Sequence, residues 1–598
     1  MEPTGPTGEV RELAPTGRPR RRALGVIAFL RGRIRASELL LVLVAIAVGA
    51  GAGALTSAVS YAAHAAQSLI YGLGPGQRLS AITHLDPLRA LALPAGGLVL
   101  GLVSWLRARR RPAAVVDPVE ANALHAGRMS ARDSLFLAIQ SVISNGSGAS
   151  VGLEAAYAQL GGGLGSALGR SLNLRRSDMR AFVGAGAGAG IAAAFGAPLT
   201  GAFYAFEIII GSYSVINVAV VVAAAIAGAW VSRALAVEPT VLHTAVTDSL
   251  TATHYLLFGA LGVICAGLGV AVMRLEAFLE RGVARLPGPR WLRPAIGGTV
   301  LAALALVDPH SLSAGHGAMT EAMAASIGLA ALAFLIIAKA SASIVALGFG
   351  FRGGLFFASL YLGALVGKFC VLALAAAGVE TGIDPMAGAL VGMGGLAVAI
   401  IGGPFTMTFL VLETTGDFAL TAATLTASIV ASLLVRETFG YSFSTWRLHL
   451  RGETIRSAHD VSWLRTLTAQ RMMRADAPVI SADTTAAAFR ARYPLGSTRR
   501  VAGLDALGGY AGLIPVSAVY ALEDPATPVA EVMIARDHWL TTDMAIKEIM
   551  GVFDQAATDE LAVLGDDREV LGVVSEAYAT RRYAEELEKA RRDLVGAD

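Results

Sequence analysis

Charged residues and cysteines are scarce in this chain. Of its 598 residues, 16% are Asp, Glu, Lys or Arg, whereas soluble domains carry about 25%. Together with a hydrophobic content of 55% and a mean hydropathy of +0.60, this excludes an ordinary soluble protein and indicates a multi-pass membrane protein. The two cysteines, Cys265 and Cys370, both lie in apolar runs, which excludes a disulfide framework.

The N-terminal segment also lacks an apolar run of the kind that a cleavable signal peptide needs. Residues 1–36 are rich in Pro, Gly and Arg, and we expect a cytoplasmic tail with a surface helix. The first two apolar segments, 39–55 and 90–105, have arginine clusters on their outer flanks. The positive-inside rule places both flanks in the cytoplasm, so the chain crosses the cell membrane outward and returns.

Changes in composition along the sequence indicate the domains. Apolar segments recur through residues 37–450, which we expect to form the transmembrane domain. Residues 451–470 read as a linker, and the charged residues 471–590 read as a cytosolic α/β domain. Both termini are therefore expected in the cytoplasm.

A first internal repeat lies in the membrane domain. "GAPLTGAFYAFE" (196–207) matches "GGPFTMTFLVLE" (402–413), with Pro, Thr and Glu at identical spacing, which argues against coincidence among Gly- and Ala-rich helices. Several apolar segments are short or broken by Gly and Pro. Broken helices in duplicated halves are typical of transporters with a midplane site. The sequence predicts an all-α membrane domain of two inverted repeats with broken helices, about 37–240 and 255–450.

A second repeat, with a period of 60 residues, lies in the C-terminal domain. "VISAD" (479–483) matches "WLTTD" (539–543), and Met473 matches Met533. Each unit reads as strand, helix, strand, turn, strand, helix. We expect two packed α/β units at 471–530 and 531–590.

Three isolated acids stand out in the apolar region: Glu154, Glu207 and Glu413. A charge in the membrane interior costs at least ~2.5 kcal/mol, so such a residue indicates function by default. Glu207 and Glu413 occupy equivalent repeat positions, which favours a shared structural task such as accepting helix-end amides. Glu154 has no acidic equivalent, because the repeat matches it with Arg352, and this asymmetry favours function.

The surroundings of Glu154 indicate which function. It follows a Gly-rich loop and opens a helix in "GLEAAYAQLGG", and helix N-termini favour anions. The second half offers the backbone amides of Gly354, Leu355 and Phe356 in "GFRGGLFFASL". Two such termini converging would form an anion site. Ionised, Glu154 would occupy this site and block the pathway; protonated, it would swing away.

These segments resemble the CLC family of chloride channels and chloride/proton antiporters over roughly residues 37–598. The resemblance places Glu154 on the family's gating glutamate, Gln159 on its glutamine, and Leu355 and Phe356 on residues whose amides contact the central anion. Tyr441 falls on the anion-contacting tyrosine, although a role in the interfacial aromatic belt is the alternative. The resemblance further implies a CBS pair at the C-terminus and a homodimer with one pore per subunit.

The chain departs from the family pattern in several places. Val115 stands where a serine helps to select chloride, so a hydroxyl donor is missing. Arg352 stands where a proline is common. Ile208 stands where antiporters carry an intracellular proton glutamate, but some antiporters lack that acid. Channel and antiporter therefore both stay open.

The expected function is transport of chloride or another small monovalent anion, coupled or not to protons. A membrane-embedded enzyme is disfavoured, because no H-E-x-x-H or Asp–Asp pair occurs in the apolar segments. A sensor using the membrane region as a mere anchor is disfavoured by the repeated broken helices. No cofactor, metal or nucleic acid is expected, although Ser575 and Glu576 are candidate contacts for an adenine nucleotide at the CBS pair.

The remaining polar residues are assigned lesser roles. Lys339 is a lone cation in an apolar segment, for which a structural pairing with a carbonyl or an acid is favoured over anion relay. His254, His310 and His316 lie in connecting segments without metal-ligand spacing and are read as solvated.

Overall fold

The computed structural model describes residues 37–110, 115–235, 250–451, 467–556 and 558–595. The chain divides into two compact units, residues 1–460 and 461–598. The predicted N-terminal tail and surface helix, 1–36, lie outside the described residues.

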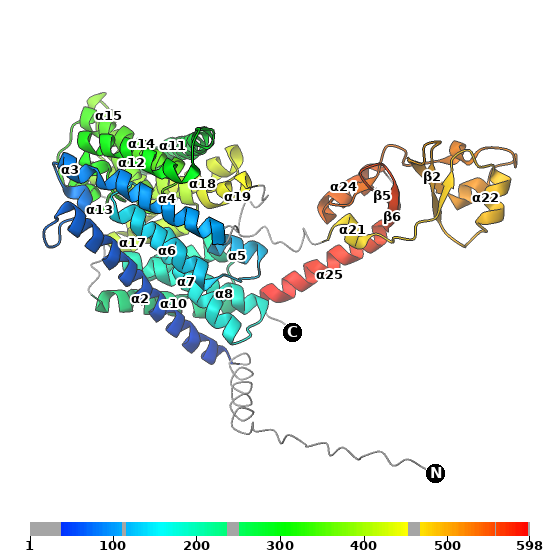
Figure 1. Ribbon diagram of the computed structural model, residues 1–598, viewed down its shortest axis with the longest axis horizontal. Helices are drawn as coiled ribbons and strands as arrows, with labels where there is room; N and C mark the ends of the chain where they lie inside the picture. Colours follow the sequence, from blue (N-terminus) through cyan, green and yellow to red (C-terminus); the bar gives the residue numbers. More distant parts are fainter. Residues whose placement is uncertain (1–36, 111–114, 236–249, 452–466, 557, 596–598) are drawn as a thin grey trace, which may run out of the picture. The chain divides into compact units, whose positions relative to one another are not determined.

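The first unit is a bundle of helices (Figure 1). Within its described residues, eight helices are long and apolar enough to cross a membrane. The helices of the first half are α2 (Glu38–Tyr71), η1 (Leu79–Ala81), α3 (Pro87–Ala90), α4 (Ala92–Arg110), α5 (Pro118–Leu124), α6 (Ala131–Gly146), α7 (Glu154–Ser171), α8 (Arg176–Phe195), α9 (Pro198–Tyr204), η2 (Ala205–Ile210) and α10 (Val215–Ala234).

The second half follows after residue 250. Its helices are α11 (Ala252–Ala284), η3 (Arg290–Leu292), α12 (Arg293–Val307), η4 (Pro309–Ser311), α13 (His316–Ala324), α14 (Leu329–Gly348), α15 (Phe356–Ala376), α16 (Pro385–Ile401), α17 (Pro404–Thr415), α18 (Phe418–Thr438) and α19 (Phe443–Leu450). The predicted all-helical membrane domain of two repeated halves is confirmed.

Glycines set the closest helix contacts, and they do so equivalently in the two halves. In the α7–α8 pair, a Cβ on Gly161 would collide with the carbonyl oxygen of Gly186, and in the α15–α16 pair a Cβ on Gly363 would collide with that of Gly392. Lipid tails are as apolar as the side chains, so helices in a membrane associate through such close packing. These contacts fix the positions of α7 and α15, whose N-termini form the site.

The short helices arise from the Gly-x-Pro motifs of the repeat. Gly196 (φ 65°) follows the last residue of α8 and Gly402 (φ 87°) follows that of α16, and both have a positive φ that favours glycine. Proline then occupies the first position of α9 and of α17, where its missing N–H costs no helical hydrogen bond. The α9 and α17 helices are therefore separate short helices, each with its N-terminus inside the helical unit.

The C-terminal unit contains two three-stranded sheets with the same design, orders β1-β2-β3 and β4-β5-β6. In each, the first pair is parallel and the second antiparallel, with register shifts at Gly503/Leu504 and at Val563/Leu564, which are 563 − 503 = 60 residues apart. The predicted 60-residue repeat of α/β units is confirmed. Its strands are β1 (Val479–Ser481), β2 (Arg500–Leu504), β3 (Tyr510–Pro515), β4 (Leu540–Thr541), β5 (Glu560–Leu564) and β6 (Val570–Ser575).

The helices of this unit are α21 (Ala469–Met472), α22 (Ala486–Arg492), α23 (Val516–Tyr520), η5 (Val529–Val532), α24 (Ile546–Ala556) and α25 (Glu576–Val595). Leu467 and Ala469, assigned to the linker from the sequence, are buried in the core of the second repeat. Met473 packs on Gly572 of the second repeat, and Met533 packs on Gly503 of the first. The segment that contains Met473, at the start of the first repeat, thus packs on the sheet of the second repeat. The segment that contains Met533, at the start of the second repeat, packs on the sheet of the first.

Candidate functional site

The N-termini of α7 and α15 meet in the interior of the first unit. Gly152 and Gly354 form an isolated antiparallel bridge: the Gly152 amide donates to the Gly354 carbonyl (2.9 Å) and the Gly354 amide donates to the Gly152 carbonyl (3.1 Å). The N-cap residues Leu153 and Leu355 have nearly the same backbone angles, φ −94° and −96°. The two halves are therefore related by a pseudo-two-fold axis at this point.

This bridge corrects the register inferred from the sequence. Gly152 is equivalent to Gly354, so Glu154 is equivalent to Phe356, and Arg352 is equivalent to Ser150. The Gly354 amide, predicted to contact an anion, is used in the bridge. The amides at the start of α15 remain without helical partners, because the first four N–H groups of a helix have none.

Glu154 is the first residue of α7, and it is 4% exposed. Its Oε2 atom has no hydrogen-bond partner among the described residues. The carboxylate folds back over Gly152, where any Cβ would collide with it, and lies next to the backbone amide of Phe357. The Glu154 carboxylate thus occupies the space that a side chain at residue 152 would take, and it lies at the N-terminus of α15.

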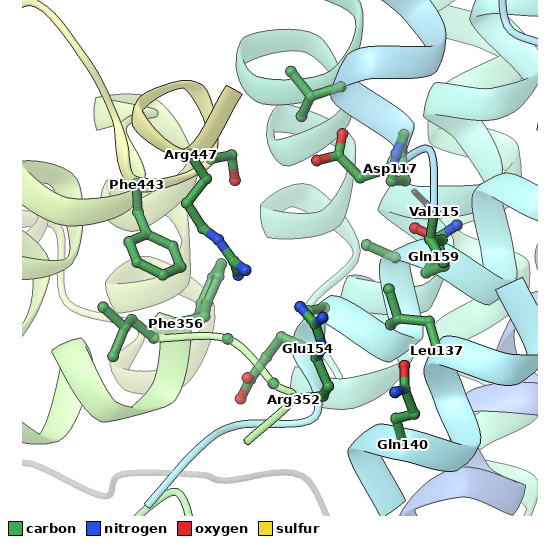
Figure 2. A pocket seen from close by; sticks show the side chains of 18 of the residues that line it. Val115, Asp117, Leu137, Gln140, Glu154, Gln159, Arg352, Phe356, Phe443 and Arg447 are labelled. Atoms are coloured by element: carbon green, nitrogen blue, oxygen red, sulfur yellow. The ribbon is translucent and has the colours of Figure 1, made fainter. Parts of the chain in front are cut away.

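Two cavities meet at Glu154. The large cavity measures about 560 Å³, and the small cavity about 70 Å³. Glu154 is the one described residue that lines both. Figure 2 shows the large cavity, in which the side chain of Glu154 lies beside Phe356 and Arg352.

Helices from both halves, together with the segments before α5 and before α15, contribute to the large cavity around Glu154. Val115, Gly354, Leu355 and Phe356 all line it, so four of the predicted anion contacts are brought together with Glu154. Gln159, one turn along α7, donates to the Val116 carbonyl (2.9 Å) and holds the Val115 segment in place. Other lining residues come from α4, α6, α9, η2, α11 and α19 and from the residues that flank α5 and α19, among them Arg107, Asp117, Gln140, Tyr204, Ile208, Glu280, Phe443, Arg447 and Arg451.

Tyr441 is not among the residues that line the large cavity, and its assignment as an anion contact stays a prediction. Its hydroxyl is 3.2 Å from Nδ1 of His449, and the two rings are stacked with centroids 4.6 Å apart. Ser442 caps α19, so the helix begins at Phe443, and this residue faces the cavity instead.

The small cavity is lined by polar side chains from other elements. They include His64, Arg78, Asn145, Ser313 and His316. The ring of His316 stacks on Phe357, with centroids 3.5 Å apart. His316 is therefore part of the Glu154 surroundings rather than a solvated loop residue.

Glu207 and Glu413 form reciprocal caps between the two halves. Glu207 accepts from the amides of Phe405 (3.0 Å) and Thr406 (2.8 Å) and from the Thr406 hydroxyl (2.6 Å). Glu413 accepts from the amides of Leu199 (2.8 Å) and Thr200 (2.8 Å) and from the Thr200 hydroxyl. Each acid thus binds the N-terminus of the short helix in the opposite half, away from the Glu154 carboxylate.

Lys339 is 1% exposed and is held by backbone and hydroxyl oxygens. Its ammonium donates to Ser150 Oγ (2.9 Å) and to the carbonyls of Ser311 (3.3 Å) and Ser313 (2.7 Å). These contacts fix the loop before Glu154 to the second half, as the structural reading of Lys339 predicted.

Outside the membrane-spanning helices, His310 is paired rather than solvated. Its Nδ1 lies 2.8 Å from Asp308, and its Nε2 lies 3.4 Å from Glu321. The hydrogen bond to Asp308 raises the pKa of His310 above its ordinary value of 6.5, and Glu321 adds to this effect.

In the C-terminal unit, Ser575 ends β6 and Glu576 begins α25. The Tyr578 amide donates to the Ser575 hydroxyl (3.3 Å), which therefore caps the helix. Their contact with an adenine nucleotide stays a prediction. Among the described residues, no group of three or more His, Cys, Asp or Glu side chains could hold a metal ion.

Comparison with known proteins agrees with this geometry. The profile described as "Voltage gated chloride channel" matches residues 96–436. The chain belongs to this family. It is 27% identical over 367 residues to the voltage-gated ClC-type chloride channel ClcB of Escherichia coli O157:H7 (strain EC4115 / EHEC), covering 60% of this chain and 87% of the relative.

Solved structures share the fold. A slow cyanobacterial Cl−/H+ antiporter is 21% identical, with a TM-score of 0.61 over 69% of this chain and 97% of its own. A eukaryotic CLC transporter is 18% identical, with a TM-score of 0.57 over 92% of this chain and 98% of its own. The CLC architecture is therefore that of this protein, an integral membrane member of a transporter family.

Proposed function

We propose that this protein moves chloride or another small monovalent anion across the membrane along a pathway that runs from the large cavity past Glu154 to the small cavity. The observation that carries the proposal is that Glu154 is the one described residue that lines both cavities. An anion passing between them has to displace this carboxylate. The names of the similar proteins, a chloride channel and a Cl−/H+ antiporter, support the same class of substrate.

The N-terminus of α15 supplies the attraction for the anion. Its first amides carry the positive end of the helix dipole without needing a fixed charge. An ionised Glu154 competes for these amides, and a protonated Glu154 does not. This competition is the gate.

Proton coupling is a second candidate, favoured by the isolation of Glu154. Its Oε2 atom has no hydrogen-bond partner among the described residues and faces two cavities, so the carboxylate can take a proton from one side and release it to the other. Channel and antiporter differ only in whether that proton moves in a fixed ratio to the anion.

The arginine-rich flanks support an orientation in the membrane. Arg107, Arg109 and Arg110 lie in the last turn of α4, and the positive-inside rule favours a cytoplasmic position for that end. We therefore expect the large cavity, which Arg107 lines, to open toward the cytoplasm, with both termini on the same side. By family resemblance the protein acts as a homodimer with one pathway per subunit.

Chloride efflux from proteoliposomes tests the proposal. Purified protein in vesicles loaded with chloride, with valinomycin and potassium to balance charge, should release chloride faster than empty vesicles. A pH gradient imposed without a chloride gradient should drive chloride only if protons are coupled. Efflux equal to that of empty vesicles, for chloride and for nitrate, would overturn the proposed function.

A further inference from the structure

Lys339, on α14, is a buried cation that makes no ion pair with any residue that the structure describes. Its side chain is 1% exposed, and its ammonium donates to one hydroxyl oxygen and two carbonyl oxygens. Three acceptors match the three N–H donors of an ammonium, whereas a neutral amine has fewer donors. These oxygens satisfy the hydrogen bonds of Lys339 but carry no net charge. A buried cation that no opposite charge offsets is costly, so Lys339 needs an acid within electrostatic reach.

Two acids lie within that reach. Asp308 precedes η4 and Glu154 begins α7, and both act electrostatically on Lys339. The third titratable neighbour, Tyr361 on α15, presents its ring to the ammonium, with the centroid 6.0 Å from Nζ. Asp308 is already paired with His310, at 2.8 Å. Glu154 is therefore the acid that remains to offset the charge of Lys339.

The effect is mutual. Of the charged side chains that the structure describes, Lys339 is the one that acts electrostatically on the Glu154 carboxylate. Arg352 lines the large cavity and Arg78 the small cavity, and both side chains are exposed, so water screens their charges more than it screens Lys339. The remaining titratable side chains that face Glu154 across the two cavities are His64, Tyr157, Tyr204 and His316.

Hydrogen bonds from both halves fix the position of this cation. Ser150, in the loop that leads to Glu154, accepts from Lys339 Nζ (2.9 Å), and the Ser313 carbonyl accepts from it on the side of the second half (2.7 Å). Lys339 is not among the residues that line either cavity, so it meets no passing anion. A fixed cation in a medium of low dielectric stabilises an ionised carboxylate and leaves a protonated one unaffected. Lys339 therefore opposes the protonation of Glu154.

We propose that Lys339 is the fixed counter-charge of Glu154 and sets the pH at which the gate opens. This rests on the proposed function, because it names what regulates the same site. Lys339 holds Glu154 ionised, and the pathway closed, until the pH falls far enough for a proton to take the place of this pairing. Lys339 is a positioning residue, since it acts on the anion only through Glu154.

Neutral substitutions of Lys339 test the proposal through the pH dependence of chloride flux in proteoliposomes. Lys339→Met removes the charge, and Lys339→Gln removes it while keeping N–H donors for the same oxygens. Without the cation, Glu154 takes up a proton at a higher pH, so the pH of half-maximal flux should rise by about one unit. Flux at neutral pH should therefore increase, which damage to the structure cannot produce.

Two controls separate the charge from the packing. Lys368 is a second buried lysine, whose ammonium donates to three backbone carbonyl oxygens at the C-terminal end of α13, and the acid that acts on it is Asp384. Lys368→Met should therefore leave the pH of half-maximal flux unchanged. Ser150→Ala removes one contact of Lys339 but keeps its charge, and it should leave this pH unchanged as well.

An unchanged pH of half-maximal flux in both Lys339 variants would refute the proposal, and so would an equal shift in Lys368→Met. Melting temperatures of the detergent-solubilised protein read the pairing without transport. Because Lys339 stabilises the ionised form of Glu154, the loss caused by Lys339→Met should be smaller in the Glu154→Gln background at about pH 8 and equal in both backgrounds at about pH 5. Equal losses at both pH values contradict the pairing. If the wild type carries no anion but shows this difference, the transport proposal fails and the pairing stands.

Discussion

The reciprocal caps of Glu207 and Glu413 predict a large and specific loss of stability. Each carboxylate accepts three hydrogen bonds from the first turn of the opposite short helix. A glutamine there keeps the size, but its NH2 group must face a backbone or hydroxyl donor. At least one charge-assisted hydrogen bond is lost, at ~1.5–3 kcal/mol, together with a charge at a helix N-terminus, at about 0.3–1 kcal/mol.

Glu413→Gln should therefore destabilise the helical unit by about 2–4 kcal/mol, and Glu207→Gln by a similar amount. Thermal unfolding in detergent, followed by the monodisperse fraction in size-exclusion chromatography, measures the change. Glu437 is exposed on α18, and Glu437→Gln is the matched control. The protein that remains folded should retain anion flux. If Glu413→Gln and Glu207→Gln unfold at the temperature of Glu437→Gln, or lose flux without losing stability, the structural role is refuted.

Three further outcomes are expected. Val115→Ser adds a hydroxyl donor to the large cavity and should raise the preference for chloride over nitrate in reversal-potential measurements; an unchanged ratio would show that residue 115 does not select. The hydrogen bond to Asp308 raises the pKa of His310 in the folded protein above its unfolded-state value of about 6.5. The stabilisation that protonated His310 gains from this pairing is therefore complete below the unfolded-state pKa. It is lost as the pH rises through the folded-state pKa. His310→Gln should thus lower the melting temperature at about pH 6 but not at about pH 9, and an equal loss at both would contradict the assignment. Adenine nucleotides should bind the C-terminal unit near Ser575 and Glu576, which calorimetry on residues 455–598 with ATP, ADP and AMP checks; no heat at millimolar nucleotide would leave a structural role.

The two internal repeats could be predicted from the sequence because equivalent residues recur at the same spacing in each copy. The Pro, Thr and Glu of the two Gly-x-Pro motifs recur at identical distances, and the reciprocal contacts of Glu207 and Glu413 follow from that symmetry. The 60-residue period likewise reappears in the two sheets, down to the register shift after Gly503.

Positions around helix starts could not be predicted to the residue. The loops before α7 and α15 are both glycine-rich, so the sequence alone matched Glu154 with Arg352, whereas the Gly152–Gly354 bridge matches it with Phe356. The backbone pairing of Gly152 with Gly354 decides how the two halves align, and this pairing cannot be seen in a single sequence.

The small cavity was not predicted from the sequence. His316 was read as solvated because it lies in a connecting segment, yet the fold brings it against Phe357. Such residues acquire a role only when distant segments converge.

The gate itself is tested most directly by Glu154→Gln in proteoliposomes. Glutamine keeps the size of the side chain but can neither ionise nor carry a proton, so anion flux should persist and become independent of pH. Proton movement driven by an anion gradient should be abolished. Glu280→Gln removes an acid from the same large cavity but away from its junction with the small one, and it should keep the wild-type pH dependence. Wild-type pH dependence in Glu154→Gln would show that Glu154 is not the gate.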